Sequence, residues 1–288
     1  MRLTISPRTA TLLLTLWPVA AACQGQHAAG TVLDRHDFTR STSHFELPGR
    51  LDEISGLALT PDGRLFGHDD ERALVHEIDP VNGSVGKRFS AGDPPLRGDF
   101  EGIAIVGERF FLVTSTGLLY EMREADDRSE APYRTSDTGL GAHCEVEGLD
   151  YDPLVDALLF ACKATRPERG VLVIHRLPLD PARGPLAPIE VSRSQLAAHG
   201  VRADFEPSAI AVDPGGTLIM VSAPTESLIE VDRSGNVLAG YRLSRSRHPQ
   251  PEGLAFGLDG TLYIADEQNG QDARISVYAP VRDDASRP

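Results

Sequence analysis

The 288-residue sequence has few cysteines, few aromatic residues and few bases. Its three cysteines include no Cys-x-x-Cys pair, which argues against zinc ribbons, iron–sulfur clusters and a disulfide scaffold. The sequence has only 28 lysines and arginines but 42 acidic residues, so the formal net charge is −14. Proteins that bind nucleic acid or an anionic bilayer present a basic surface. We therefore expect no nucleic-acid partner, and no membrane association other than through a lipid anchor.

Familiar catalytic motifs are also missing from the sequence. There is no Gly-x-Ser-x-Gly elbow, no His-Glu-x-x-His, no P-loop and no dinucleotide fingerprint. The nine histidines are scattered along the chain. The sequence therefore assigns no catalytic residue, and it leaves open whether the protein is an enzyme.

The longest apolar run lies at the N-terminus, where Thr11 to Ala22 follow Arg2 and Arg8. These 12 residues are fewer than the roughly 20 that span a bilayer, but they are typical of a signal peptide. The run ends in Ala-Ala-Ala before Cys23, which resembles a lipobox. We expect a lipoprotein-type signal peptide over 1–22, lipidation of Cys23, and an exported protein of the cell envelope, at the outer membrane or periplasmic face. The alternative is an ordinary secretory signal that is cut nearby.

The rest of the chain repeats one short pattern five times. Each copy places a small residue after a polar pair and before an apolar run, and the small residues are Gly56, Gly102, Gly148, Ala209 and Gly253. The copies are 44–46 residues apart, except for one interval of 61 with an insert at 178–200, where 194–199 are expected to form a short helix. Turn signals such as Asp62-Gly63 separate the apolar runs and favour β-hairpins. Four antiparallel strands in each repeat of this length are typical of a propeller blade.

The repeats predict an all-β fold, a five-bladed β-propeller of four-stranded antiparallel blades. The fifth copy supplies only three strands, at 253–256, 261–265 and 274–278. Because an open ring leaves an unpaired edge, we predict that the N-terminal segment 36–47 adds the fourth strand of the last blade. The predicted organisation is a linker over 23–35, one propeller domain over 36–280 and a tail over 281–288.

Two cysteines, Cys144 and Cys162, flank a predicted hairpin. The predicted register places them about three residues out of opposition, whereas a disulfide needs Cα atoms within about 7 Å. The register therefore favours two unpaired cysteines, and a disulfide between them stays open as the alternative.

Two polar columns precede the small residue of each copy. The first column consists of Glu53, Asp99, Glu145, Glu206 and Gln250, and the second column consists of Ser55, Glu101, Glu147, Ser208 and Glu252. The columns are two residues apart, so on a strand they share one face. The first strand of a propeller blade lines the central channel, so seven carboxylates should point toward one axis. We call these seven side chains the carboxylate ring.

One histidine and five further acidic residues lie at the end of the second strand in two copies, on the same predicted end of the ring. These candidate channel-mouth residues are His68, Asp69, Asp70, Glu71, Asp266 and Glu267. Clustered carboxylates repel one another unless they are protonated or neutralised by a cation. Because the donors are oxygens, the cation expected is Ca²⁺ first and Mg²⁺ second. We predict a metal site centred on Glu101, Glu147 and Glu252 and completed by the first column. The alternative is a water-filled channel without a fixed ion.

These motifs resemble the SdiA-regulated (YjiK-like) family of exported bacterial β-propellers, which is distantly similar to NHL-repeat propellers. The resemblance covers about residues 45–280 and rests on Glu53 to Ala58, His68 to Glu71 and Asp99 to Ala104 within the fivefold pattern. It implies a five-bladed propeller, an N-terminal membrane-targeting segment and a calcium site, but no settled activity. Ser208, Ala209 and Gln250 depart from the pattern, which leaves metal ligation by the fourth blade open.

Two functions from different classes fit these features. The first is a monomeric, calcium-binding module or scaffold at the cell envelope, whose protein or small-molecule ligand stays open. The second is a calcium-dependent hydrolase of a lactone, ester or phosphoester, since other propellers use a channel calcium as a Lewis acid. We favour the binding module, because an excess of carboxylates reduces Lewis acidity and repels anionic substrates.

Overall fold

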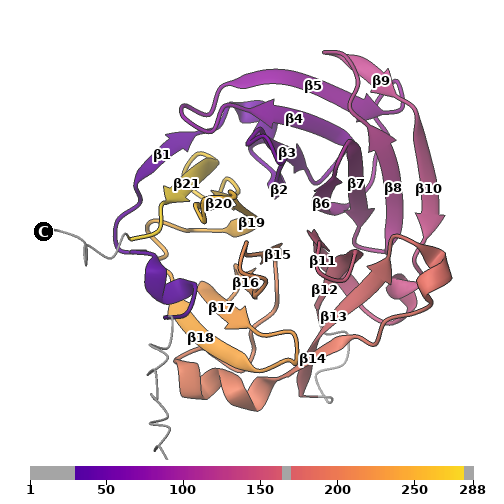
Figure 1. Ribbon diagram of the computed structural model, residues 1–288. Helices are drawn as coiled ribbons and strands as arrows, with labels where there is room; N and C mark the ends of the chain where they lie inside the picture. The colour runs from indigo at the N-terminus through magenta and orange to yellow at the C-terminus, as the bar shows by residue number, and fades with distance from the viewer. Residues whose placement is uncertain (1–29, 164–169, 282–288) are drawn as a thin grey trace, which may run out of the picture.

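The computed structural model describes residues 30–163 and 170–281, which form five β-sheets around one axis (Figure 1). The predicted signal peptide over 1–22, Cys23, most of the linker and residues 282–288 lie outside the described residues. None of the helices in the described ranges is long and apolar enough to cross a membrane.

Each sheet is one blade, and its first strand lies nearest the axis (Figure 1). Blade 1 contains β2 (Ile54–Leu59), β3 (Leu65–Asp69), β4 (Leu74–Ile78) and β5 (Val85–Ala91). Blade 2 contains β6 (Phe100–Val106), β7 (Arg109–Thr114), β8 (Leu118–Arg123) and β10 (Tyr133–Asp137). Blade 3 contains β11 (Glu145–Asp152), β12 (Ala157–Lys163), β13 (Val171–Pro178) and β14 (Ile189–Ser192). Blade 4 contains β15 (Ala209–Val212), β16 (Leu218–Ser222), β17 (Ser227–Val231) and β18 (Val237–Arg242). Blade 5 contains β19 (Pro251–Phe256), β20 (Leu262–Asp266), β21 (Arg274–Tyr278) and β1 (Ser43–Glu46). The prediction of a five-bladed propeller is confirmed.

The N-terminal strand closes the ring, as predicted. β1 pairs antiparallel with β21, with Phe45 opposite Ile275. The same segment carries the 3-10 turns η1 (Leu33–Arg35) and η2 (Gly49–Leu51). The backbone N–H of Leu33 donates to Glu230 in blade 4 at 2.9 Å, so the packed fold begins a few residues before 36. The two ends of the chain thus share blade 5.

One strand was not predicted. The segment β9 (Ser129–Ala131), between β8 and β10 of blade 2, crosses to blade 1 and pairs parallel with β5. Blade 1 therefore has a fifth strand, which ties the outer edges of blades 1 and 2 together. No repeat pattern marks this strand, because it occurs in one blade only.

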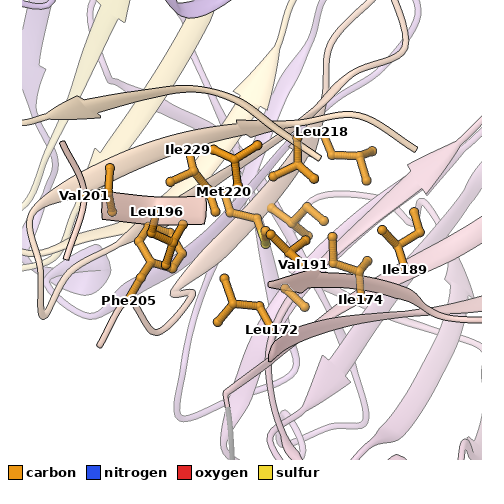
Figure 2. Packing of buried hydrophobic residues seen from close by; sticks show 14 of the residues in the cluster. Leu172, Ile174, Ile189, Val191, Leu196, Val201, Phe205, Leu218, Met220 and Ile229 are labelled. Atoms are coloured by element: carbon orange, nitrogen blue, oxygen red, sulfur yellow. The ribbon is translucent and has the colours of Figure 1, made fainter. Parts of the chain in front are cut away.

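The hydrophobic core is divided among the interfaces between blades. Each of the five clusters of buried residues joins two neighbouring blades. The cluster between blades 3 and 4 combines Leu172 and Ile174 with Met220 and Ile229 (Figure 2). The insert adds β14 and the predicted short helix, found as the 3-10 helix η6 (Arg193–His199), to this cluster. It also contains η5 (Pro181–Arg183), which has no buried residue. Stability therefore depends on every pair of blades rather than on one centre.

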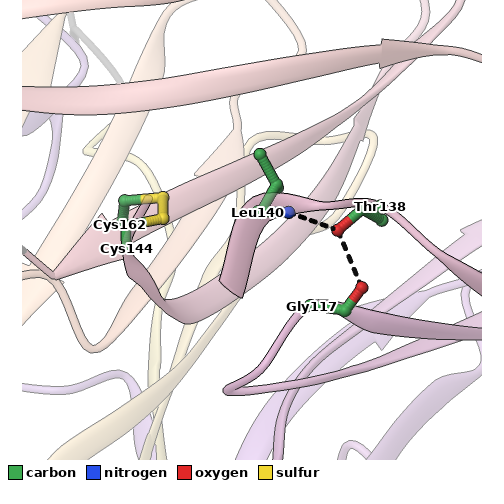
Figure 3. Close-up of a disulfide and its surroundings, with 5 residues drawn as sticks. All are labelled: Gly117, Thr138, Leu140, Cys144 and Cys162. Atoms are coloured by element: carbon green, nitrogen blue, oxygen red, sulfur yellow. Dashed lines mark hydrogen bonds between the residues drawn. A yellow bond between two sulfur atoms is a disulfide. The ribbon is translucent and has the colours of Figure 1, made fainter. Parts of the chain in front are cut away.

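The expectation that Cys144 and Cys162 stay unpaired is wrong. Their Cα atoms are 5.6 Å apart and the sulfurs form a disulfide (Figure 3). Cys162 lies opposite Val146, two residues beyond Cys144. The chain turns at η3 (Leu140–Ala142), where the Cys144 N–H donates to the Leu140 carbonyl at 3.0 Å. This turn carries Cys144 back toward β12, so the offset in register does not separate the sulfurs.

We predict that Gly102→Ala destabilises the propeller, because an added Cβ would lie 2.6 Å from the backbone nitrogen of Leu149 in the next blade. Overpacking of this kind costs about 1–3 kcal/mol, measurable by urea unfolding. Gly86→Ala is the matched control, since its Cβ would meet nothing within 4 Å. Equal free energies of unfolding for the two variants would contradict the close approach of the inner strands.

Candidate functional site

The second-column residues lie at β-bulges on the innermost strands. The register shifts between Ile54 and Gly56, between Phe100 and Gly102, between Val146 and Gly148, and between Pro251 and Gly253. The residues skipped by the pairing are Ser55, Glu101, Glu147 and Glu252. A bulge leaves its extra residue unpaired and redirects the side chain. Blade 4 differs, because β15 begins only at Ala209.

The three glutamates of this column, Glu101, Glu147 and Glu252, are the inner glutamates. Ser55 Oγ of blade 1 donates to Glu101 Oε2 of blade 2 at 3.2 Å. The charges of Glu147 and Glu252, from blades 3 and 5, both act on Glu101. The bulges thus bring carboxylates from three blades into electrostatic contact.

Burial and mutual repulsion hold the inner glutamates partly in the acid form. Desolvation, followed by the charges of Glu147, Asp99 and Glu252, raises the pKa of Glu101 to about 8. Desolvation and the charge of Glu267 raise the pKa of Glu252 to about 8. The pKa of Glu147 rises to about 7, again mainly by burial, although Lys163 opposes the shift. These carboxyls gain from any nearby positive charge.

Lys163 supplies one such charge. Its Nζ lies 3.2 Å from Glu147 Oε1, and Lys163 is opposite Glu145 in the β11–β12 hairpin. Sequence analysis missed this residue, although the hairpin register would have placed it beside the two acids. One ammonium group compensates only part of the acidic charge.

The first column lies nearer to solvent. Glu53, Asp99 and Glu145 are exposed and Glu206 is half-buried. Ser115 Oγ donates to Asp99 Oδ2 at 2.5 Å. Gln250 replaces an acid in this column, and its Nε2 donates to Glu267 Oε2 at 2.5 Å.

Two of the predicted channel-mouth residues, Asp70 and Glu267, interact electrostatically with other carboxylates at this end of the ring. Burial, followed by the charges of Glu53, Asp69, Asp99 and Glu71, raises the pKa of Asp70 to about 6. Burial and the charges of Asp70 and Glu53 raise the pKa of Glu267 to about 7. Asp70 Oδ1 is buried and has no hydrogen-bond partner among the described residues. Asp70 of blade 1 and Glu267 of blade 5 therefore add two acidic groups to the seven of the carboxylate ring.

The other mouth candidates are placed differently. Asp69 is buried, which raises its pKa to about 6, and Glu71 is exposed with its carboxylate 3.5 Å from Arg72. His68 is fully buried behind β2, where its Nε2 lies 2.5 Å from the position that a Cβ on Gly56 would take. Its Nδ1 contacts the Asp69 carbonyl at 2.9 Å. His68 therefore packs between blades and does not face the mouth.

Asp266 is also fully buried, in a network that sequence analysis did not find. Its Oδ2 lies 2.7 Å from His248 Nδ1, and His248 Nε2 lies 2.6 Å from the Tyr278 hydroxyl. These residues are 18 and 30 positions apart and follow no repeated pattern. The network links β20 and β21 of blade 5 to the connection between β18 and β19.

A pocket of about 300 Å³ opens beside the inner glutamates in blades 3 to 5. It reaches Glu147 and Glu252, and its remaining polar lining carries both signs of charge: Lys163, Glu206, Ser208, Glu226, Arg245, Gln250 and Asn269. The pocket is polar and small, so it suits a charged ligand rather than an apolar one.

The donor chemistry of the ring suits a hard cation, because carboxylate and hydroxyl oxygens converge and Asp70 Oδ1 lacks a partner. Within residues 30–163 and 170–281, however, the group of three metal-ligand atoms closest together is Cys144, Cys162 and His175, whose sulfurs form the disulfide. The ring oxygens are spaced more widely than the 4.8 Å of that group. An ion in the ring would therefore need side-chain rotation or bridging water.

Comparison with known protein families assigns the sequence to a family. The SdiA-regulated family model matches residues 33–270. The chain belongs to the SdiA-regulated family. A search of curated proteins finds no match.

Solved structures share the fold at low sequence identity. The chain resembles the Myxococcus xanthus glutaminyl cyclase with a TM-score of 0.59 and 16% identity, over 85% of this chain and 97% of that one. A luciferin-regenerating enzyme matches with a TM-score of 0.53 and 11% identity, over 83% and 98% of the two chains. The PQQ-bound aldose sugar dehydrogenase from Streptomyces coelicolor matches with a TM-score of 0.51 and 15% identity, over 82% and 98%. These likenesses support the fold of this family member.

We predict that the metal-free protein becomes more stable as the pH falls from 8.5 to 6.5. The pKa of Glu101 and of Glu252 is about 8 in the fold but near 4.5 when unfolded, so only the folded state takes up protons in this window. The stabilisation is complete below the unfolded pKa and is lost as the pH rises through 8. We expect the melting temperature to rise by about 5 °C over this window.

The window stops at pH 6.5 because burial lowers the pKa of His68 and of His76 to about 4, so that below pH 6.5 these two histidines oppose the stabilisation by the carboxyls. The double variant Glu101→Gln/Glu252→Gln should weaken the dependence, and the part that remains comes from Glu147 and Glu267, whose pKa values are about 7. Glu108→Gln, at the exposed β6–β7 turn, is the control and should leave it unchanged. A flat wild-type profile would show that the inner glutamates are ionised at pH 7.

Proposed function

We propose that this member of the SdiA-regulated family is an exported Ca²⁺-binding propeller that acts as a binding module or scaffold at the cell envelope. The observation that carries the proposal is the convergence of the inner glutamates, from three blades, with pKa values of about 7 to 8. Three carboxyl groups with raised pKa values so close together favour the binding of a divalent cation, because the cation relieves the repulsion among them.

The inner glutamates would hold the ion, with Asp70 and the first column as further oxygen donors. Bound calcium supplies a fixed positive charge at the axis and links blades 1, 2, 3 and 5. The residues of this chain then orient the ligand: Lys163 attracts acidic groups in the 300 Å³ pocket and Glu206 attracts basic groups, while Arg245 and Glu226, whose side chains lie 3.2 Å apart, pair with each other and can add a contact of either sign. A small zwitterion or a charged peptide segment fits this lining.

We predict that calcium raises the melting temperature of chelator-treated protein and gives a heat of binding in calorimetry. Binding stabilises the fold by about 2.7 kcal/mol when free calcium is a hundredfold above Kd. Glu252→Gln should weaken binding at least tenfold, because it removes a charge and keeps the shape. Glu108→Gln again serves as the control.

No heat and no melting shift with millimolar calcium would remove the metal from the proposal. Magnesium, tested in parallel, should bind more weakly than calcium, since the widely spaced donors suit the larger and more flexible coordination shell of calcium.

We also propose that Cys23 anchors the protein in the membrane through lipidation, with no need for a transmembrane helix. Cys23→Ser should move the protein from the membrane fraction to the soluble fraction and change its mobility on a gel. A variant that stays in the membrane fraction with unchanged mobility would contradict lipidation.

A calcium-dependent hydrolase is the second candidate. It is favoured by the carboxyls of Glu101 and Glu252, which stay protonated near neutral pH and therefore qualify as general acids. The three compared structures of similar fold are named as enzymes, which shows that such propellers support catalysis. A screen of calcium-loaded protein against lactones, aryl esters and phosphoesters decides between the candidates. Turnover that Glu101→Gln abolishes would favour the hydrolase.

A further inference from the structure

A basic pocket lies where the N-terminal strand closes the ring. Its volume is about 430 Å³, and its lining consists of Thr39, Arg40, Ser41, His44, Ser246, Arg247, Arg274 and Ser276. The lining holds three arginines, one histidine and four hydroxyl groups, but no carboxylate. This composition contrasts with a chain in which acidic residues outnumber bases by 42 to 28.

Three segments build the pocket. Arg274 and Ser276 are alternate residues of β21 and share one face of the strand, and His44 of β1 is opposite Ser276. Arg247 comes from the connection between β18 and β19, and its Nη1 donates to the Phe38 carbonyl at 2.8 Å. The basic groups are therefore held by paired strands and by a hydrogen bond to the N-terminal segment.

The three guanidinium groups form no close ion pair, although the charges of Arg40 and Arg247 act on Asp37 and that of Arg274 acts on Asp266. In the described part of the chain, Arg40, Arg247 and Arg274 form no ion pair within 4.0 Å, whereas Arg64, Arg123 and Arg233 each contact a carboxylate. Arg274 Nη2 donates to Gln271 Oε1, but Arg274 Nε is buried and has no hydrogen-bond partner among the described residues. A buried donor without a partner is costly, so this site gains from an acceptor.

Glu46 is opposite Arg274 in the β1–β21 pair, but it is exposed and forms no ion pair with Arg274 within 4.0 Å. Two other carboxylates near the pocket, Asp37 and Asp266, are already engaged. Asp37 accepts hydrogen bonds from the backbone N–H and the hydroxyl of Thr39. Asp266 contacts His248 and the Gln250 N–H. Neither residue lines the pocket, so the positive charge there is available to a ligand.

We propose that this pocket binds a phosphate or sulfate group. Guanidinium groups match the tetrahedral oxyanion with paired N–H donors, and serine hydroxyls such as that of Ser41 add further donors. Because the pocket combines β1 with β21 and the β18–β19 connection, the bound anion would hold the closing strand to blade 5. The ligand therefore stabilises ring closure, independently of the calcium proposed at the axis.

The test uses the full-length protein in calcium-free buffer at pH 7.5, titrated with inorganic phosphate or sulfate at constant ionic strength. We expect both anions to raise the melting temperature and to give a binding isotherm in calorimetry, with chloride as the reference. Arg40→Gln and Arg274→Gln should each weaken phosphate binding about tenfold. Arg202→Gln is the matched control, since Arg202 is exposed, contacts Asp204 and lies outside the pocket.

Arg40 is exposed, so its substitution leaves the fold intact even if Arg274→Gln lowers stability. Phosphate that stabilises no more than chloride would overturn the proposal, and so would wild-type affinity in both Arg40→Gln and Arg274→Gln.

Two further ligands distinguish the source of the phosphate group. Glycerol 3-phosphate represents a soluble ester, and vesicles of phosphatidylcholine with one third phosphatidylglycerol represent an anionic headgroup. Sedimentation with the vesicles that Arg40→Gln abolishes would identify a lipid headgroup. Binding of glycerol 3-phosphate without vesicle sedimentation would identify a soluble ester.

Discussion

The close approach of five inner strands to one axis is the constraint on which the rest of the structure depends. A Cβ on Gly102 would lie 2.6 Å from the backbone of the next blade, and one on Gly148 would lie 3.0 Å from Ile210 N. Only a small residue fits where neighbouring blades meet so tightly. Each such residue follows a bulge in four of the five blades, and the bulge directs the residue before it toward the axis. Tight packing and the carboxylate ring therefore have one structural origin.

This arrangement concentrates negative charge where water is scarce. The fold tolerates it because Lys163 offsets part of the charge and because Ser55 donates to Glu101. Burial, and after it the remaining repulsion, raises the pKa values of Glu101 and Glu252. Buried carboxylates that lie close together destabilise a protein unless a ligand neutralises them. The ring is therefore more informative about function than the exposed acids on the outer strands.

The sequence was sufficient to predict the blades, because glycine and turn residues recur at a nearly constant interval. It was also sufficient to predict the inner glutamates, since their column repeats with the glycine. Features that occur once could not be predicted this way. β9 follows no repeat, the turn at η3 brings Cys144 to Cys162 despite the register, and His68 packs behind Gly56 instead of facing the mouth. The basic pocket needs residues from both ends of the chain, which only the closed ring brings together.

The shared blade has a consequence for the order of folding. The Ala279 N–H donates to the Thr42 hydroxyl, across a sequence separation of 237 residues. β1 is made early during synthesis but has no partner until β21 follows almost at the end of the chain. Closing so long a loop carries a large entropic cost, so the last blade forms after the earlier hairpins. Until β21 is complete, β1 therefore stays an unpaired strand edge, while the hairpins of the other four blades can already form.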